Sequence, residues 1–143
     1  MATATRDTSH NRSAGRSLRI GLWVAQIMLF VMFAMSGVMK LATPIAQLAA
    51  MMPWTGQLPE GFVRFIGLVD LAGGIGILLP ALTRIQPRLG TLAALGIIVL
   101  QILAIAFHTS RGEFGVLPLN FVLLPFAVFV LWGRARRAPI LPR

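Results

Sequence analysis

Four long apolar stretches, separated by short polar segments, dominate the pattern of this chain. They cover residues 19–41, 62–79, 89–107 and 116–132, and nearly every charged residue lies outside them or at their ends. A helix needs about 20 mostly apolar residues to cross the hydrocarbon core of a bilayer, and these stretches hold about 17 to 23. The pattern therefore predicts an all-α integral membrane protein, built as a bundle of four transmembrane helices.

The polar segments divide the chain further. Residues 1–17 are polar, rich in Ser, Thr and Arg and without periodicity, which predicts a disordered tail. A membrane domain over residues 18–133 follows, and residues 134–143 form a basic tail. The longest connection, residues 42–61, contains a mostly apolar stretch at 44–52 before Pro53, Gly56 and Pro59 interrupt it. This stretch predicts a short extra helix in the first outer loop.

The distribution of basic residues predicts the orientation. Ten of the thirteen Lys and Arg residues precede the first stretch, separate the second from the third, or follow the fourth. The other side has only Lys40, Arg64 and Arg111. Because positive charge is enriched in cytoplasmic segments, both termini are expected in the cytoplasm.

Composition excludes several classes of function. Hydrophobic residues make up 57% of the chain, charged residues 12%, and the net charge is +9. The basic residues flank apolar stretches instead of forming a stripe with interleaved aromatics, so the expected partner is the lipid bilayer and not a nucleic acid. The chain has no cysteine, and of its two histidines His10 falls in the N-terminal tail, so we expect no metal site. It also lacks a phosphate-binding glycine loop, an HExxH pair and a nucleophile elbow, so the sequence identifies no catalytic residue and no recognisable cofactor-binding motif, and leaves the cofactor open.

Asp70 is the most informative single residue, because it lies near the middle of the second stretch. An ionised acid at the bilayer centre costs roughly 2.5–3.5 kcal/mol, so it must face the bundle interior, find a partner or remain protonated. Small residues beside it, Gly67, Gly73 and Gly74, let a neighbouring helix approach closely, as does Gly37 in the first stretch. Asp70 is accordingly either a proton carrier or ligand contact, or a polar link between helices.

Other polar residues converge on the same half of the bundle. Lys40 ends the first stretch, His108 ends the third with Gln101 on the same face, and Asn120 lies near the outer end of the fourth. At a rise of 1.5 Å per residue, Gln101 and Asp70 reach a similar depth. Lys40, Asp70, Gln101, His108 and Asn120 are therefore predicted to surround one polar cavity for a ligand or a proton, although Lys40 and His108 also suit a simple interfacial position.

Several of these segments resemble the DoxX-like family of small bacterial membrane proteins. The end of the first stretch, Gly37 to Leu41, is similar to the family's Gly-x-x-Lys-Leu, and residues 67–80 resemble its Gly-x-x-acid-x-x-Gly-Gly-x-Gly segment ending at proline. Asp70 stands where the family usually has glutamate. Phe107-His108, Arg111-Gly112-Glu113, Asn120 and Trp132-Gly133-Arg134 also look familial, so the resemblance spans about residues 29–133.

The resemblance implies a four-helix bundle in the bacterial cytoplasmic (inner) membrane. Named relatives are associated with a quinol oxidase complex and with membrane oxidoreductase assemblies. Because this chain has neither haem-ligand pairs nor cysteines, independent oxidoreductase activity is not expected of it. The leading hypothesis is an accessory subunit of a membrane redox complex, or a binder of a small apolar ligand such as a quinone. Alternatives are a small proton-coupled transporter and a self-contained enzyme, and the partner is either a redox protein or a second copy of the chain.

Overall fold

A computed structural model describes the backbone of residues 4–143 and the side chains from residue 15 onward. Its long helices are α1 (Ala4–Ala42), α3 (Glu60–Thr83), α4 (Arg88–Ser110) and α5 (Leu117–Trp132). Each forms all or part of a segment long and apolar enough to cross a membrane, as the sequence predicts; for α5 this segment is Phe114–Arg137, which includes the helical turns at both ends. The described chain is all-helical, because in lipid a helix satisfies its own backbone N–H and C=O groups.

Short elements complete the fold. Helix α2 (Ile45–Met51) and the 3-10 turn η1 (Pro53–Gly56) lie between α1 and α3, so the predicted extra helix in the first loop is confirmed. The 3-10 turn η2 (Phe114–Val116) precedes α5, and a π-helical turn, η3 (Gly133–Arg137), continues it. Residues 138–143 then fold back, so that the N–H of Arg143 donates to the carbonyl of Arg84.

Helix α1 begins earlier than the predicted first span. Its backbone is helical from Ala4, through most of the segment for which the sequence predicts a disordered tail, whereas residues 1–3 lie outside the described part of the chain. Once the apolar part of α1 is helical, each further residue adds one hydrogen bond. The helix therefore extends into the polar segment without a second, costly nucleation step. The segment predicted as a basic tail is also not fully exposed, because Ala138 is buried against the bundle.

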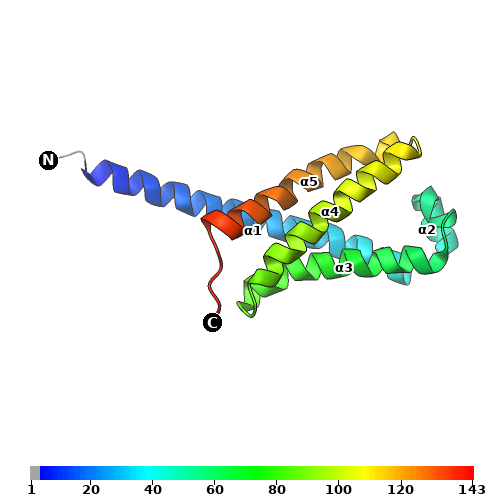
Figure 1. Cartoon of the computed structure of the whole chain (residues 1–143), viewed down its shortest axis with the longest axis horizontal. Helices are drawn as coiled ribbons and strands as arrows, with labels where there is room; N and C mark the ends of the chain where they lie inside the picture. The colour runs from blue at the N-terminus through cyan, green and yellow to red at the C-terminus, as the bar shows by residue number, and fades with distance from the viewer. Residues whose placement is uncertain (1–3) are drawn as a thin grey trace.

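The four long helices pack in sequence and close into a bundle. Helix α1 lies along α3, α3 against α4, α4 against α5, and α5 returns to α1 (Figure 1). The start of α1, the C-terminal segment and the connection between α3 and α4 lie at one end of this bundle. Helix α2 and the connection between α4 and α5 lie at the other (Figure 1). We call these the basic end and the loop end.

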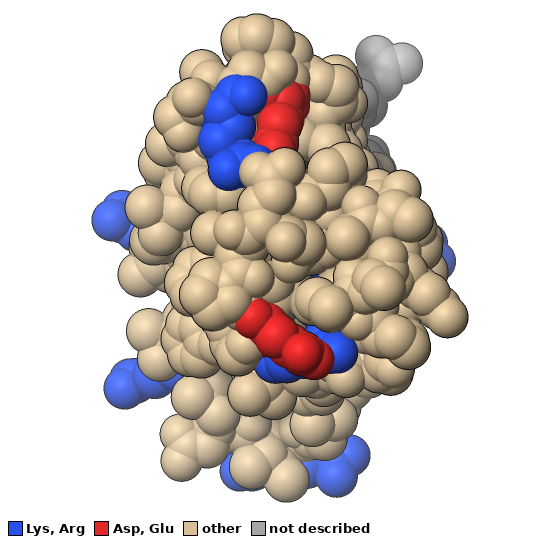
Figure 2. Space-filling model, turned by 90° about the vertical axis from the view of Figure 1, so that its right-hand side faces the viewer, with Lys and Arg blue, Asp and Glu red and all other residues tan. Residues whose placement is uncertain are grey.

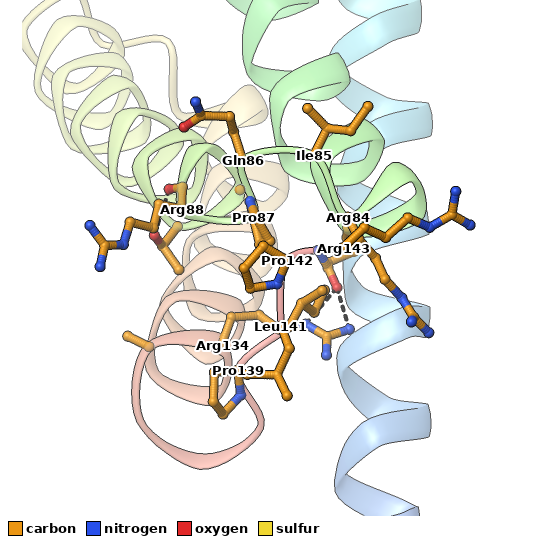
Figure 3. A pocket seen from close by; sticks show the side chains of 16 residues that line it. Arg84, Ile85, Gln86, Pro87, Arg88, Arg134, Pro139, Leu141, Pro142 and Arg143 are labelled. Carbon is orange, nitrogen blue, oxygen red and sulfur yellow. Dashed lines mark hydrogen bonds between the residues drawn. The ribbon is translucent and has the colours of Figure 1, made fainter.

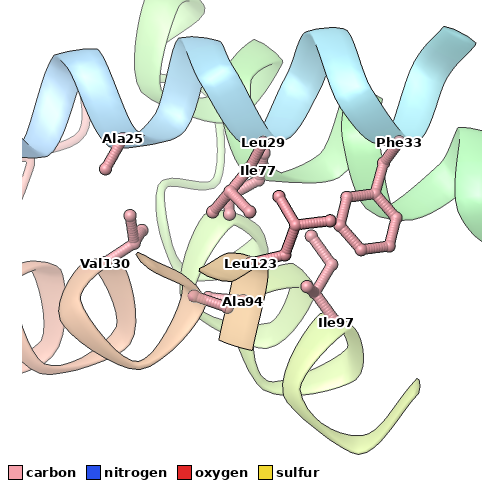
Figure 4. Close-up of a cluster of buried hydrophobic side chains, with 9 residues drawn as sticks. Ala25, Leu29, Phe33, Ile77, Ala94, Ile97, Leu123 and Val130 are labelled. Atoms are coloured by element: carbon pink, nitrogen blue, oxygen red, sulfur yellow. The ribbon is translucent and has the colours of Figure 1, made fainter. Parts of the chain in front are cut away.

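A cluster of buried apolar side chains occupies the middle of the bundle (Figure 4). All four long helices contribute to it: Ala25, Leu29 and Phe33 from α1, Ile77 from α3, Ala94 and Ile97 from α4, and Leu123, Ala127 and Val130 from α5. Polar groups are placed on either side of this cluster, toward the two ends. The core therefore separates a polar site near the loop end from another near the basic end.

Glycines allow the backbones of neighbouring helices, chiefly α1 and α3, to approach closely. A Cβ atom on Gly37 of α1 would lie 2.7 Å from the carbonyl oxygen of Gly67 on α3. A Cβ on Gly74 would lie 2.8 Å from the backbone nitrogen of Ala34. Gly73 faces α4 instead, where an added Cβ would meet Ile97 at 3.2 Å. Gly37, Gly67 and Gly74 all lie between α1 and α3, so these two helices approach closely enough for short polar side chains to join them.

Candidate functional site

A buried ion pair joins α1 to α3 near the loop end. The Nζ atom of Lys40 lies 2.8 Å from Oδ2 of Asp70, and the two side chains are only 8% and 7% exposed. Ser36, one turn before Lys40 on α1, donates to the same carboxylate oxygen at 2.9 Å. Lys40 also donates to the hydroxyl of Ser36 at 2.5 Å. Asp70 thus finds a cationic partner and a hydroxyl, which meets the requirement that a buried charge be paired.

The approach of the two helices makes this pairing geometrically possible. Gly67 lies one turn before Asp70 on α3, and a Cβ at this position would come within 2.8 Å of the Cβ of Lys40. Gly37 lies between Ser36 and Lys40 in the sequence and contacts the backbone of α3. Any larger residue at either glycine would push α1 away from the carboxylate. The glycines therefore position the ion pair.

One oxygen of Asp70 remains available. Both hydrogen bonds to the carboxylate go to Oδ2, and the described residues donate none to Oδ1. Within the described part of the chain, every fully enclosed side-chain nitrogen or oxygen has a hydrogen-bond partner. It follows that Oδ1 is not fully enclosed, and Asp70 is one of the residues that line the adjacent pocket. This oxygen can accept a hydrogen bond from a bound molecule.

The pocket beside the ion pair has a volume of about 500 Å³ and lies between the loop-end halves of the four long helices. Met52, Trp54 and Leu58, from the loop between α1 and α3, contribute to its wall. Most of its lining is apolar, and Phe33 and Leu123 of the core form part of it. A volume in this range holds a small organic molecule. The side chains that line it are Met32, Phe33, Ser36, Lys40, Met52, Trp54, Leu58, Phe62, Ile66, Asp70, Leu100, Gln101, Leu103, Ala104, Phe107, His108, Val116, Leu119, Asn120 and Leu123.

All five residues that the sequence singles out line this one pocket. Gln101 of α4 is 3% exposed and lies at the pocket wall. Asn120 of α5 is half-buried and donates to the carbonyl of Val116 at 3.4 Å, a long hydrogen bond. His108 lies at the loop end of α4. The polar groups thus come from α1, α3, α4 and α5.

An aromatic and ionic cluster surrounds His108. Its Nδ1 lies 2.7 Å from Oε2 of Glu113, and Arg111 donates to the other carboxylate oxygen at 2.9 Å. The hydrogen bond with His108, helped by Arg111, holds the pKa of Glu113 below its ordinary value. Phe107 and Trp54 meet edge to face, with ring centroids 6.0 Å apart. Arg111 also reaches back to the side chain of Gln57, so the two loops are joined across the mouth of the bundle.

Ion pairs are visible from the loop end, where acidic and basic side chains lie side by side on the surface (Figure 2). Besides Arg111 and Glu113, the exposed pair is Glu60 with Arg64, at 2.8 Å. Arg64 has a further role that sequence reasoning missed. Its guanidinium donates to the carbonyls of Lys40 and Thr43 and thereby caps the end of α1.

Two other contributors were not predicted as site residues. Ser36 donates to the same carboxylate oxygen of Asp70 as Lys40 does. It could have been predicted from its position four residues before Lys40, which places both on one face of α1. Trp54 places its ring 5.9 Å from Nζ of Lys40, a cation–π contact that depends on the loop conformation and leaves no signal in the sequence. Among the described residues, no three His, Cys, Asp or Glu side chains are placed to hold a metal ion.

Four membrane-crossing helices around a buried ion pair define a small multi-pass helical membrane protein. This chain belongs to the DoxX-like family, whose sequence profile matches residues 24–130. The match includes the spans that carry the ion pair and the pocket. No curated protein and no solved structure matches the chain.

Proposed function

We propose that this DoxX-like protein binds a small, mostly apolar ligand with a polar head group, such as a quinone, in the loop-end pocket. By this binding it serves as an accessory subunit of a membrane redox complex. The proposal includes a bacterial cytoplasmic membrane location with both termini in the cytoplasm, which the excess of Arg at the basic end supports.

The observation that carries the proposal is the open Oδ1 of Asp70 beside Lys40 in an otherwise apolar pocket. Ligand pockets are mostly apolar, with a few polar groups that fix the orientation of the ligand. The ammonium of Lys40 and the amide of Gln101 supply donors for a carbonyl, and Oδ1 of Asp70 supplies an acceptor for a hydroxyl. A molecule that alternates between carbonyl and hydroxyl forms, as a quinone does, suits both kinds of group.

Aromatic side chains extend this complementarity. Trp54 and Phe107 line the pocket next to Lys40 and His108, so a flat ring can pack against their faces or edges. Apolar residues from α1, α3 and α5 line the rest of the pocket, where a hydrocarbon tail avoids water. The ligand supplies the redox chemistry, and the chain supplies binding and orientation.

Fluorescence of Trp54 provides the test. The other two tryptophans, Trp23 and Trp132, lie at the basic end, so a ligand in the loop-end pocket affects Trp54 most strongly. Decyl-ubiquinone titrated into the purified full chain in detergent should quench this fluorescence saturably, and Trp54→Phe should remove that component.

A matched pair of substitutions on α4 makes the test specific. Ala104 lines the pocket, whereas Ala106 is exposed on the lipid-facing side and does not. Ala104→Phe fills the pocket while leaving both residues of the ion pair unchanged, and it should weaken binding about tenfold or more, since overpacking costs about 1–3 kcal/mol. Ala106→Phe should leave binding unchanged. Non-saturable quenching, equal in both variants, would reject the pocket as the binding site.

A further inference from the structure

A second and larger hollow lies at the basic end of the bundle. It has a volume of about 920 Å³ and is bounded by the connection between α3 and α4 and by the segment after α5 (Figure 3). Arginine side chains reach it from both sides: Arg84 from the connection, Arg88 from the start of α4, and Arg134 and Arg143 from the segment after α5. The core cluster separates this hollow from the loop-end pocket, so the two sites are distinct.

The charge around this hollow is not neutralised within the described side chains. No acidic residue lines it. Glu60, Asp70 and Glu113 are the only acids among residues 15–143, and each is paired with a base near the loop end. Among residues 15–143, no acidic side chain is therefore placed to pair with the arginines of the hollow.

One of these arginines is held in place. The guanidinium of Arg134 donates through Nε and Nη2 to the amide oxygen of Gln26, at 2.9 and 2.6 Å. Gln26 is fixed in turn by donating to the carbonyl of Ile77 at 2.7 Å, and Trp23 lies under the guanidinium at 5.1 Å. Arg134 is 8% exposed, yet its partners are neutral. A buried and positioned guanidinium without an acid is ready to bind an anion in a fixed geometry.

Most of the remaining lining of the hollow is apolar, and Gln26, Gln86 and Thr91 are its polar members. Ile85 and Leu141 border it, with prolines of both segments beside them (Figure 3). The hollow also lies where two candidate membrane spans, Glu60–Thr83 and Arg88–Ser110, meet at their ends. A molecule at this level of a membrane presents a phosphate to the arginines and the start of an acyl chain to the apolar groups. Basic pockets between transmembrane helices are known to hold anionic head groups.

We propose that this hollow at the basic end binds the phosphate head group of an anionic phospholipid, with Arg134 as its fixed anchor and Arg84, Arg88 and Arg143 around it. The site is independent of the ligand proposed for the loop-end pocket. A bound head group would fasten the segment after α5 against the connection between α3 and α4.

Native mass spectrometry of the full chain in detergent tests this proposal, with phosphatidylglycerol and phosphatidylcholine as the two probes. The test variant is Arg84→Gln with Arg88→Gln, and the matched control is Arg136→Gln with Arg137→Gln. The control removes the same charge from exposed positions at the same end that do not line the hollow. Arg143→Gln lies outside every helix and provides a second test that spares the helical fold.

We expect the wild type to bind phosphatidylglycerol in preference to phosphatidylcholine. The Arg84 and Arg88 variant should bind phosphatidylglycerol about 30-fold more weakly, given the contribution of each basic residue near an anionic surface, and the control should bind it nearly as well as the wild type. Arg143→Gln should weaken binding in the same direction by a smaller factor. Equal weakening in test and control, or no preference between the lipids, would overturn the proposal. Displacement of phosphatidylglycerol by equimolar inorganic phosphate would also overturn it, in favour of a site for a free anion.

Discussion

The pairing of Lys40 with Asp70 makes a quantitative prediction for a double-mutant cycle. The charges lie 2.8 Å apart, and at an effective dielectric constant of about 20 this separation corresponds to about 6 kcal/mol of Coulomb attraction. Much of that attraction offsets the loss of hydration of two nearly buried groups. Removing one partner leaves an unpaired buried charge, so Lys40→Met and Asp70→Asn should each lower the free energy of unfolding by about 3 kcal/mol.

The double variant should behave differently from the sum of the two single variants. Lys40→Met with Asp70→Asn leaves no unpaired charge, so its unfolding free energy should lie within about 1 kcal/mol of the wild type, compared with a loss of about 6 kcal/mol for independent sites. Reversible unfolding of the purified protein in detergent measures all four members of the cycle. Additive losses would refute the argument that these two residues stabilise the bundle as a pair.

Three further predictions concern packing, capping and pH. Gly37→Ala should destabilise the bundle by about 1–3 kcal/mol because its Cβ would meet the backbone of α3, whereas Gly96→Ala, which has nothing within 4 Å, should be neutral or slightly stabilising in the same thermal unfolding assay. Arg64→Met should cost about 2 kcal/mol in chemical unfolding because the end of α1 loses charged hydrogen bonds; a loss no larger than that of Glu60→Gln, which breaks only the exposed pair, would contradict this role. The pKa of Glu113 is lowered in the fold, chiefly by its hydrogen bond with His108, so its stabilising contribution is complete above its ordinary pKa of 4.5 and is lost as the pH falls below it. The difference in Tm between wild type and Glu113→Gln should therefore be constant above this value and shrink below it, and a difference independent of pH would contradict the assigned interaction.

The fold follows from the sequence because the bilayer imposes a strong constraint. Apolar stretches long enough to cross it must be helical, and short connections make neighbouring helices antiparallel. Polar residues within such stretches must face the interior, which is why Asp70 and Gln101 could be selected as pocket residues in advance. The start of α1 was less predictable, since helix propagation beyond the membrane depends on small free-energy differences.

The contacts of the candidate site depend on how the helices are rotated against each other. The sequence places Lys40 at the end of the first span and Asp70 near the middle of the second, and only the close packing at Gly37 and Gly67 decides that they touch. Gln26 and Arg134 are 108 positions apart, and their hydrogen bonds depend on the closure of the bundle through α5. A glutamine inside the first span is itself a signal of a polar partner, although it does not identify that partner.

Occupancy of the loop-end pocket in the native membrane tests the central claim most directly. The full chain should be extracted from its own membranes in a mild detergent, and the small molecules and proteins that accompany it should be identified by mass spectrometry. An Ala104→Phe variant prepared in parallel serves as the control. We predict that a quinone or similar apolar molecule accompanies the wild type and is depleted in Ala104→Phe, together with a redox protein as partner. A wild-type protein that carries no such molecule, or the same amount as Ala104→Phe, would contradict the proposed function.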